Sequence, residues 1–114
     1  MNQPTIWHNP RCSKSRETLA LLEDQGFTPA IVKYLESTPT ADEIRDTLTL
    51  LGITATDLIR KGESLYKDLG LANASEADLV KAMATHPILI ERPVVFHNGK
   101  VSLGRPPKSV LSIL

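Results

Sequence analysis

The chain has 114 residues, its 13 lysines and arginines balance 13 aspartates and glutamates, and 41% of its residues are hydrophobic. These values predict a single globular domain spanning residues 1–114, and the balanced charge argues against disorder and against nucleic-acid binding. No apolar run approaches the ~18 residues of a membrane span and no export signal is visible, so we expect no membrane partner and a cytoplasmic location. The single cysteine cannot form a disulfide within its own chain.

The first third of the chain predicts a strand–helix–strand unit. Residues 5–8 are β-prone and end at the turn signal Asn9-Pro10. Residues 13–25 carry leucines at helical spacing, and residues 30–35 form a second apolar run. Two strands joined by a helix in this way are expected to be parallel.

The middle of the chain is expected to be helical. Thr40 and Glu43 have the spacing of a capping box, in which each side chain bonds the other residue's backbone amide. Four helices are predicted, at residues 40–52, 54–58, 64–69 and 75–86.

The last part of the chain predicts two strands and a helix. Residues 94–97 and 100–103 flank Asn98-Gly99, the strongest short hairpin signal, and Pro106-Pro107 begins a terminal helix. Without the helical block, the order of elements is that of a thioredoxin/glutaredoxin-like α/β fold. We therefore predict a mixed four-stranded sheet with a helical insertion between strands 2 and 3.

Cys12 lies where such a fold carries a reactive cysteine, after the first strand and at the start of the first helix. Arg11, Lys14 and Arg16 surround it. Free amides at a helix start, the helix dipole and nearby cations favour thiolate over thiol, and they also favour an incoming oxyanion. A lone cysteine is more often a small buried hydrophobe, but the basic helix entry favours the reactive thiol.

Two other cysteine chemistries fail on spacing. A tyrosine-phosphatase-like loop would need an arginine six positions after Cys12, where the chain has Thr18. A dithiol CxxC motif would need a second cysteine at the position of Ser15. Any disulfide cycle must therefore take its second thiol from another molecule.

Residues 8–19, HNPRCSKSRETL, resemble the active-site loop of the glutaredoxin-coupled arsenate reductase (ArsC) family. Further stretches agree in order and spacing: residues 34–36, 59–61, 66–71, 86–93 and 104–106. The resemblance implies a nucleophilic Cys12 that reduces arsenate to arsenite, with Arg60, Arg92 and Arg105 binding the oxyanion. It also implies a cis peptide bond at Arg92-Pro93, next to the cysteine.

The residue types suit that chemistry. Planar guanidinium groups match the oxygens of a tetrahedral anion with paired hydrogen bonds better than ammonium groups do. Four residues are supporting candidates: His8, Asn9, Ser15 and Pro93. Ser15 lies one helical turn beyond Cys12 and could donate to the thiolate, or be an ordinary first-turn serine. His8 could orient the loop, favour the thiolate when charged, or simply end the strand.

The resemblance implies glutathione as a diffusible co-substrate and glutaredoxin as a partner, with no bound cofactor. The spacing of cysteine and histidines predicts no metal site. Two other functions stay open: an Spx-like regulatory protein, although Ser15 removes the CxxC motif that many of these carry, and a general glutathione-dependent thiol oxidoreductase. Arg11 and Lys14 replace small residues of several arsenate reductases, and could aid anion capture or narrow the site.

Overall fold

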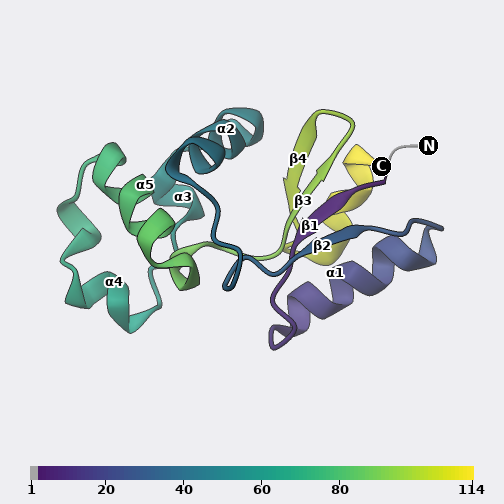
Figure 1. Cartoon of the computed structure of the whole chain (residues 1–114), viewed down its shortest axis with the longest axis horizontal. Helices are drawn as coiled ribbons and strands as arrows, with labels where there is room; N and C mark the ends of the chain where they lie inside the picture. Colours follow the sequence, from purple (N-terminus) through teal and green to yellow (C-terminus); the bar gives the residue numbers. More distant parts are fainter. Residues whose placement is uncertain (1–2) are drawn as a thin grey trace. The chain divides into compact units, whose positions relative to one another are not determined.

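The computed structural model describes residues 3–114, which form two compact units (Figure 1). Unit 1 consists of residues 3–37 and 92–114, and unit 2 consists of residues 38–91. No helix within residues 3–114 is long and apolar enough to cross a membrane.

Unit 1 is built on a four-stranded mixed sheet with strand order β2-β1-β3-β4. Its elements are β1 (Thr5–Trp7), α1 (Ser13–Asp24), β2 (Ala30–Val32), β3 (Val94–His97), β4 (Lys100–Leu103) and the 3₁₀ helix η3 (Pro107–Ile113). Strand β1 is parallel to β2 and antiparallel to β3, which pairs antiparallel with β4. The predicted thioredoxin-like α/β fold is confirmed, with both hairpin strands at the predicted residues.

Strand β2 ends at Val32, whereas the sequence predicted a strand as far as residue 35. The chain turns at this point, because the carbonyl of Lys33 accepts hydrogen bonds from the amides of Glu36 and Ser37. An apolar run at a sheet edge does not reveal where such a turn begins.

One face of the sheet packs against α1 and η3. Strands β1 and β3 contribute Ile6 and Val95 to this core, and the helices contribute Leu22, Val110 and Ile113. The prediction of a terminal helix is corrected in type, because η3 is a 3₁₀ helix. Its backbone bonds span three residues: the amide of Ser109 donates to the carbonyl of Pro106, and the amide of Leu114 donates to the carbonyl of Leu111.

The hairpin between β3 and β4 turns at Asn98 and Gly99, whose φ angles are 54° and 73°. Both residues have the positive φ of a type I′ turn, as the Asn-Gly pair predicts. Beside this turn, the buried His97 has Nδ1 at 2.9 Å from the carbonyl oxygen of Ile113, which ties the end of η3 to the hairpin.

Unit 2 is the predicted helical insertion between β2 and β3. It contains α2 (Ala41–Leu51), α3 (Ala55–Leu58), α4 (Ser64–Asp68), η1 (Leu71–Asn73), α5 (Glu76–Thr85) and η2 (Pro87–Leu89). The capping box of Thr40 and Glu43 is present in both directions at the start of α2. Helices α2 and α5 pack together, and Ile59 forms an isolated antiparallel bridge with Ile90.

Candidate active site

The end of the sheet in unit 1 brings three segments together. Trp7 at the end of β1 pairs with Val94 at the start of β3, which pairs with Leu103 at the end of β4. The segments after β1, before β3 and after β4 therefore leave the sheet at the same end. They carry Cys12, Arg92 and Arg105 respectively.

Cys12 occupies the N-cap position of α1 with an extended backbone, φ −95° and ψ 123°. Its amide donates to the carbonyl of Asn9 at 3.0 Å, and its carbonyl accepts from the amide of Arg16 at 3.0 Å. The thiol is buried, with 9% of the residue exposed. No side chain of residues 3–114 caps this helix start, so the first-turn amides are available to an anion beside the sulfur.

A buried pair of side chains braces the loop before Cys12. Ser15 Oγ lies 2.6 Å from His8 Nδ1 and accepts a hydrogen bond from the amide of Asn9 at 3.0 Å. Ser15 is fully buried and His8 nearly so. If His8 Nδ1 carries a proton, Ser15 Oγ accepts twice and its own proton is free; otherwise that proton is donated to His8.

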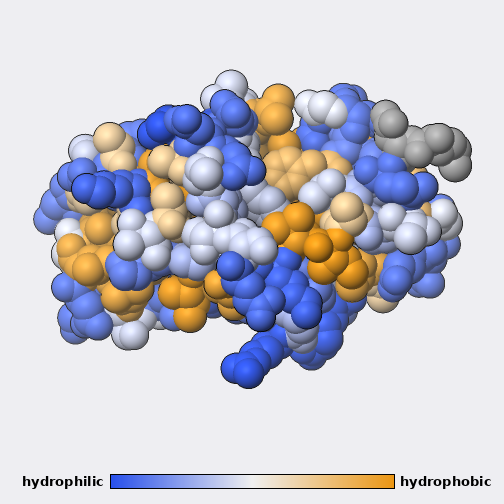
Figure 2. Space-filling model, in the orientation of Figure 1, coloured by the Kyte–Doolittle hydropathy of each residue, from blue (hydrophilic) through white to orange (hydrophobic). Residues whose placement is uncertain are grey.

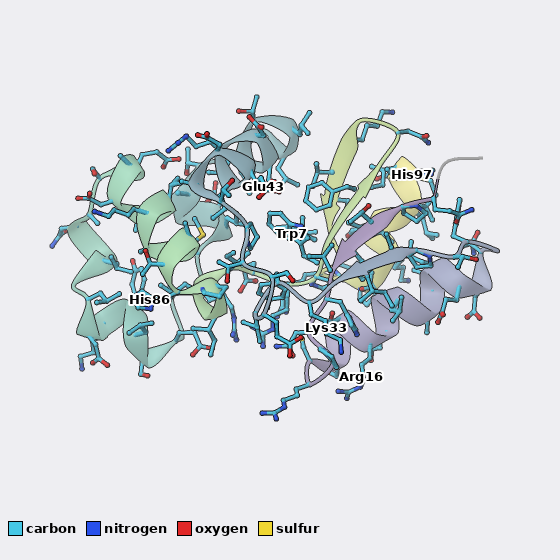
Figure 3. All side chains as sticks on the ribbon, in the orientation of Figure 1. Trp7, Arg16, Lys33, Glu43, His86 and His97 are labelled. Atoms are coloured by element: carbon cyan, nitrogen blue, oxygen red, sulfur yellow. The ribbon has the colours of Figure 1, made fainter. Side chains whose placement is uncertain are left out.

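Burial holds the pKa of His8 below its ordinary value, and the positive charges of Lys33 and then Arg16 lower it further. Figure 3 shows Lys33 and Arg16 on the same side of unit 1, near the start of α1. The lowered pKa favours the neutral imidazole. This favours the loop-orienting role of His8 over a role as a charged neighbour of the thiol.

Asn9 shapes the loop itself. Its Oδ1 accepts a hydrogen bond from the amide of Arg11 at 3.0 Å, a local turn that asparagine side chains often make. Arg16 Nη1 donates to the carbonyl of Pro10 at 2.9 Å, so this guanidinium folds back over the same loop.

Arg92 carries two buried nitrogen atoms, Nε and Nη1, that have no hydrogen-bond partner within residues 3–114. Arg105 Nη1 donates to the carbonyl oxygen of Arg92 at 3.2 Å, which links the two arginine segments. The predicted cis bond at Arg92-Pro93 is confirmed, and the structure adds a second at Arg105-Pro106 that the sequence did not predict.

Gly104 is a residue of this region that the sequence did not single out. A Cβ atom at this position would lie 2.5 Å from Thr18 Oγ1 and 2.6 Å from Pro93 Cγ. Its amide donates to the carbonyl of Pro93 at 3.0 Å. The segments that carry the arginines thus pack directly on α1, two turns from Cys12, and only glycine permits this approach. The place of Gly104 just before an Arg-Pro pair was the available signal.

Arg60 belongs to unit 2. Its amide donates to the carbonyl of Leu89 at 2.7 Å, its Nη1 is hydrogen-bonded to Glu63, and its Nε lies 3.4 Å from Glu91 Oε1. Two carboxylates therefore already compensate its charge. Its assignment to the oxyanion site stays a prediction from the sequence.

Within the described residues there is no group of three histidine, cysteine or acidic side chains that could hold a metal ion.

Comparison with known proteins places this arrangement in a family. The profile of the ArsC family matches residues 7–113, a range that includes Cys12 and all three arginines. The chain belongs to the ArsC family.

Its relatives resemble it along nearly the whole length. It is 51% identical to "Uncharacterized protein YfgD" of Escherichia coli (strain K12), over 98% of this chain and 97% of that protein. It is 44% identical to an arsenate reductase of Neisseria meningitidis, over the full length of both chains. The solved structure of an arsenate reductase from Vibrio cholerae matches with a TM-score of 0.95 and 50% identity, covering 98% of each chain.

Proposed function

We propose that this protein is an arsenate reductase, which reduces arsenate to arsenite with Cys12 as the nucleophile and with glutathione and glutaredoxin as the reductants. Relatives named arsenate reductase, similar over nearly all of the chain, support the activity. The reductants come from the sequence resemblance.

The observation that carries the proposal is the state of Arg92. Nε and Nη1 of its guanidinium are buried without acceptors among residues 3–114. Burying donors of a charged group without partners costs about 1–3 kcal/mol or more, so such groups call for an explanation. An oxyanion at this end of the sheet would supply acceptor oxygens to this guanidinium. The segment that carries Cys12 follows β1 at the same end.

Each of the site residues of unit 1 has a separate role in the reaction. The Cys12 sulfur attacks arsenic, forming an As–S bond, and one oxygen leaves as water. Arg92 donates to the remaining oxygens, and Arg105, tied to the Arg92 carbonyl, stands beside it. The amides at the start of α1 and the guanidinium groups stabilise the charge that develops on those oxygens.

The reduction needs two electrons from thiols. Arsenate and two thiols give arsenite, one disulfide and one water, so arsenic(V) becomes arsenic(III) while two thiol sulfurs are oxidised. Glutathione attacks the Cys12 adduct, and glutaredoxin completes the reduction. With one cysteine in the chain, both reducing thiols come from outside it. We place this reaction in the cytoplasm, where thiols are kept reduced.

The test is arsenite formation by the purified protein, with glutathione and glutaredoxin together and with each omitted in turn. Turnover is expected only with the thiol reductants and is abolished in Cys12→Ser, because serine cannot carry the redox step. Wild-type protein that exchanges thiols with disulfides but forms no arsenite would instead be a general thiol oxidoreductase. Protein that does neither would favour the regulatory alternative.

A further inference from the structure

Three cations gather around the Cys12 loop from separate parts of unit 1. Arg11 lies in the loop, Arg16 extends from α1, and Lys33 follows the end of β2. The amide of His8 donates to the carbonyl of Val32 at 2.8 Å, which sets the segment containing Lys33 beside the start of the loop. Figure 2 shows hydrophilic residues gathered where Figure 1 places the start of α1.

No carboxylate of residues 3–114 forms an ion pair with any of these three cations. Among residues 3–114, Arg11 and Lys33 form no ion pair, and the guanidinium of Arg16 donates only to the backbone carbonyl of Pro10. Lys14 differs, because its ammonium lies 3.7 Å from Glu17. Because the chain as a whole has no net charge, this local excess of positive charge is a feature of the site.

We propose that Arg11, Arg16 and Lys33 form a carboxylate-binding rim that recruits the small anionic thiol which reacts at Cys12. The proposal rests on the proposed function, and it names the residues that recognise its co-substrate. Arg11 and Lys33 are exposed and carry their charges on long side chains, which suits carboxylates held several bonds away from a reacting sulfur. The buried nitrogens of Arg92 suit a compact oxyanion instead.

The positive charges of the rim affect a buried group of the loop. Lys33 and Arg16 both contribute to the lowered pKa of the buried His8, after the larger effect of burial. The same positive charges raise the local concentration of anions near the exposed surface of the loop.

Thiol–disulfide exchange tests the rim without arsenate. The Cys12 sulfur bonds to one sulfur of an added disulfide, the disulfide's own S–S bond breaks, and the other half leaves as a thiolate. Oxidised glutathione, which carries carboxylates, is compared with the neutral 2-hydroxyethyl disulfide. The ratio of the two rates cancels any change in the intrinsic reactivity of Cys12.

The variants are Arg11→Gln, Lys33→Gln and the double variant, with Lys100→Gln as the matched control. Lys100 is an exposed cation of unit 1 at the hairpin end of the sheet, opposite Cys12. The preference for oxidised glutathione is expected to fall about threefold in each single variant and about tenfold in the double variant. It should also disappear in wild type at ~1 M salt, where the Debye length is about 3 Å.

An unchanged ratio in the double variant, or an equal fall in Lys100→Gln, would overturn the rim. If the ratio of the two rates falls in the variants as expected but the wild-type protein does not reduce arsenate, the rim is supported and the proposed function is refuted. If the wild-type protein forms arsenite but the ratio is unaltered in the variants, the proposed function is supported and the rim is refuted.

Discussion

Gly104→Ala is expected to destabilise the protein because the added methyl group has no room. The new Cβ would lie 2.5 Å from Thr18 Oγ1, 2.6 Å from Pro93 Cγ and 3.1 Å from Thr18 Cγ2. Comfortable carbon contacts are about 3.5–4.0 Å, so the neighbours must move by roughly 1 Å.

Neither neighbour moves freely. Thr18 is fully buried, and its hydroxyl donates to the carbonyl of Lys14 at 2.8 Å. Pro93 is held by the hydrogen bond from the amide of Gly104 to its carbonyl. Overpacking of this kind costs about 1–3 kcal/mol, while replacing glycine restricts the unfolded chain and returns about 0.4–1 kcal/mol. We expect a net loss of about 1–2 kcal/mol in the free energy of unfolding.

Urea unfolding followed by the fluorescence of the single tryptophan measures this loss. Trp7 is buried in unit 1, with its ring centroid 4.9 Å from that of Phe96. Gly62→Ala is the matched control, because its Cβ would meet nothing within 4 Å and its φ is not positive. Thr18→Ala removes two of the three close contacts, so it should recover at least about 0.5 kcal/mol in the Gly104→Ala background.

A Gly104→Ala protein as stable as wild type would refute the close packing of these segments on α1. Equal losses in Gly104→Ala and Gly62→Ala would show a general effect of replacing glycine. Absence of any coupling with Thr18→Ala would place the strain elsewhere.

Three further substitutions test the loop and the second unit. Ser15→Ala should lower the free energy of unfolding by about 1–3 kcal/mol, because it leaves the buried imidazole of His8 and the part-buried amide of Asn9 without their partner. The exposed Ser112→Ala should change it by less than ~0.5 kcal/mol, and equal effects of the two substitutions would contradict the buried pair. Folding lowers the pKa of His8, so the free energy of unfolding should fall as the pH drops below the unfolded pKa of ~6.5. His8→Gln should remove this contribution to the pH dependence, which is at most about 1.4 kcal/mol per pH unit. Identical pH profiles of unfolding for the two proteins would refute this. If Arg60 binds the oxyanion, Arg60→Ala should raise the KM for arsenate about tenfold or more. An unchanged KM in a variant with normal circular dichroism would show that Arg60 serves only in its ion pairs with Glu63 and Glu91.

The sequence predicts the order of elements well because the strongest signals are local. The Asn98-Gly99 turn and the capping box of Thr40 and Glu43 depend on residues within a few positions of one another, and the structure has both. The end of β2 and the 3₁₀ form of η3 depend on which backbone groups bond one another locally, and hydrophobic periodicity does not encode this.

The site divides in the same way. The position of Cys12 at a helix start follows from local patterns, and resemblance named the arginines. The contact of Gly104 with Thr18 joins residues 86 positions apart, and the pairing of Arg60 with Glu91 spans the helices α4 and α5. Neither follows from composition or spacing, because each depends on how distant segments meet.

The most direct test of the account is arsenate-dependent turnover of Arg92→Ala and Arg92→Lys, with alkylation of Cys12 by neutral iodoacetamide measured on the same proteins. Loss of the guanidinium should cost about 1.5–3 kcal/mol in kcat/KM, roughly a tenfold to 150-fold fall, and lysine should recover only part of it. The alkylation rate should hardly change, because Arg92 acts on the oxyanion. Full turnover in Arg92→Ala would contradict the assignment of its buried nitrogens to arsenate.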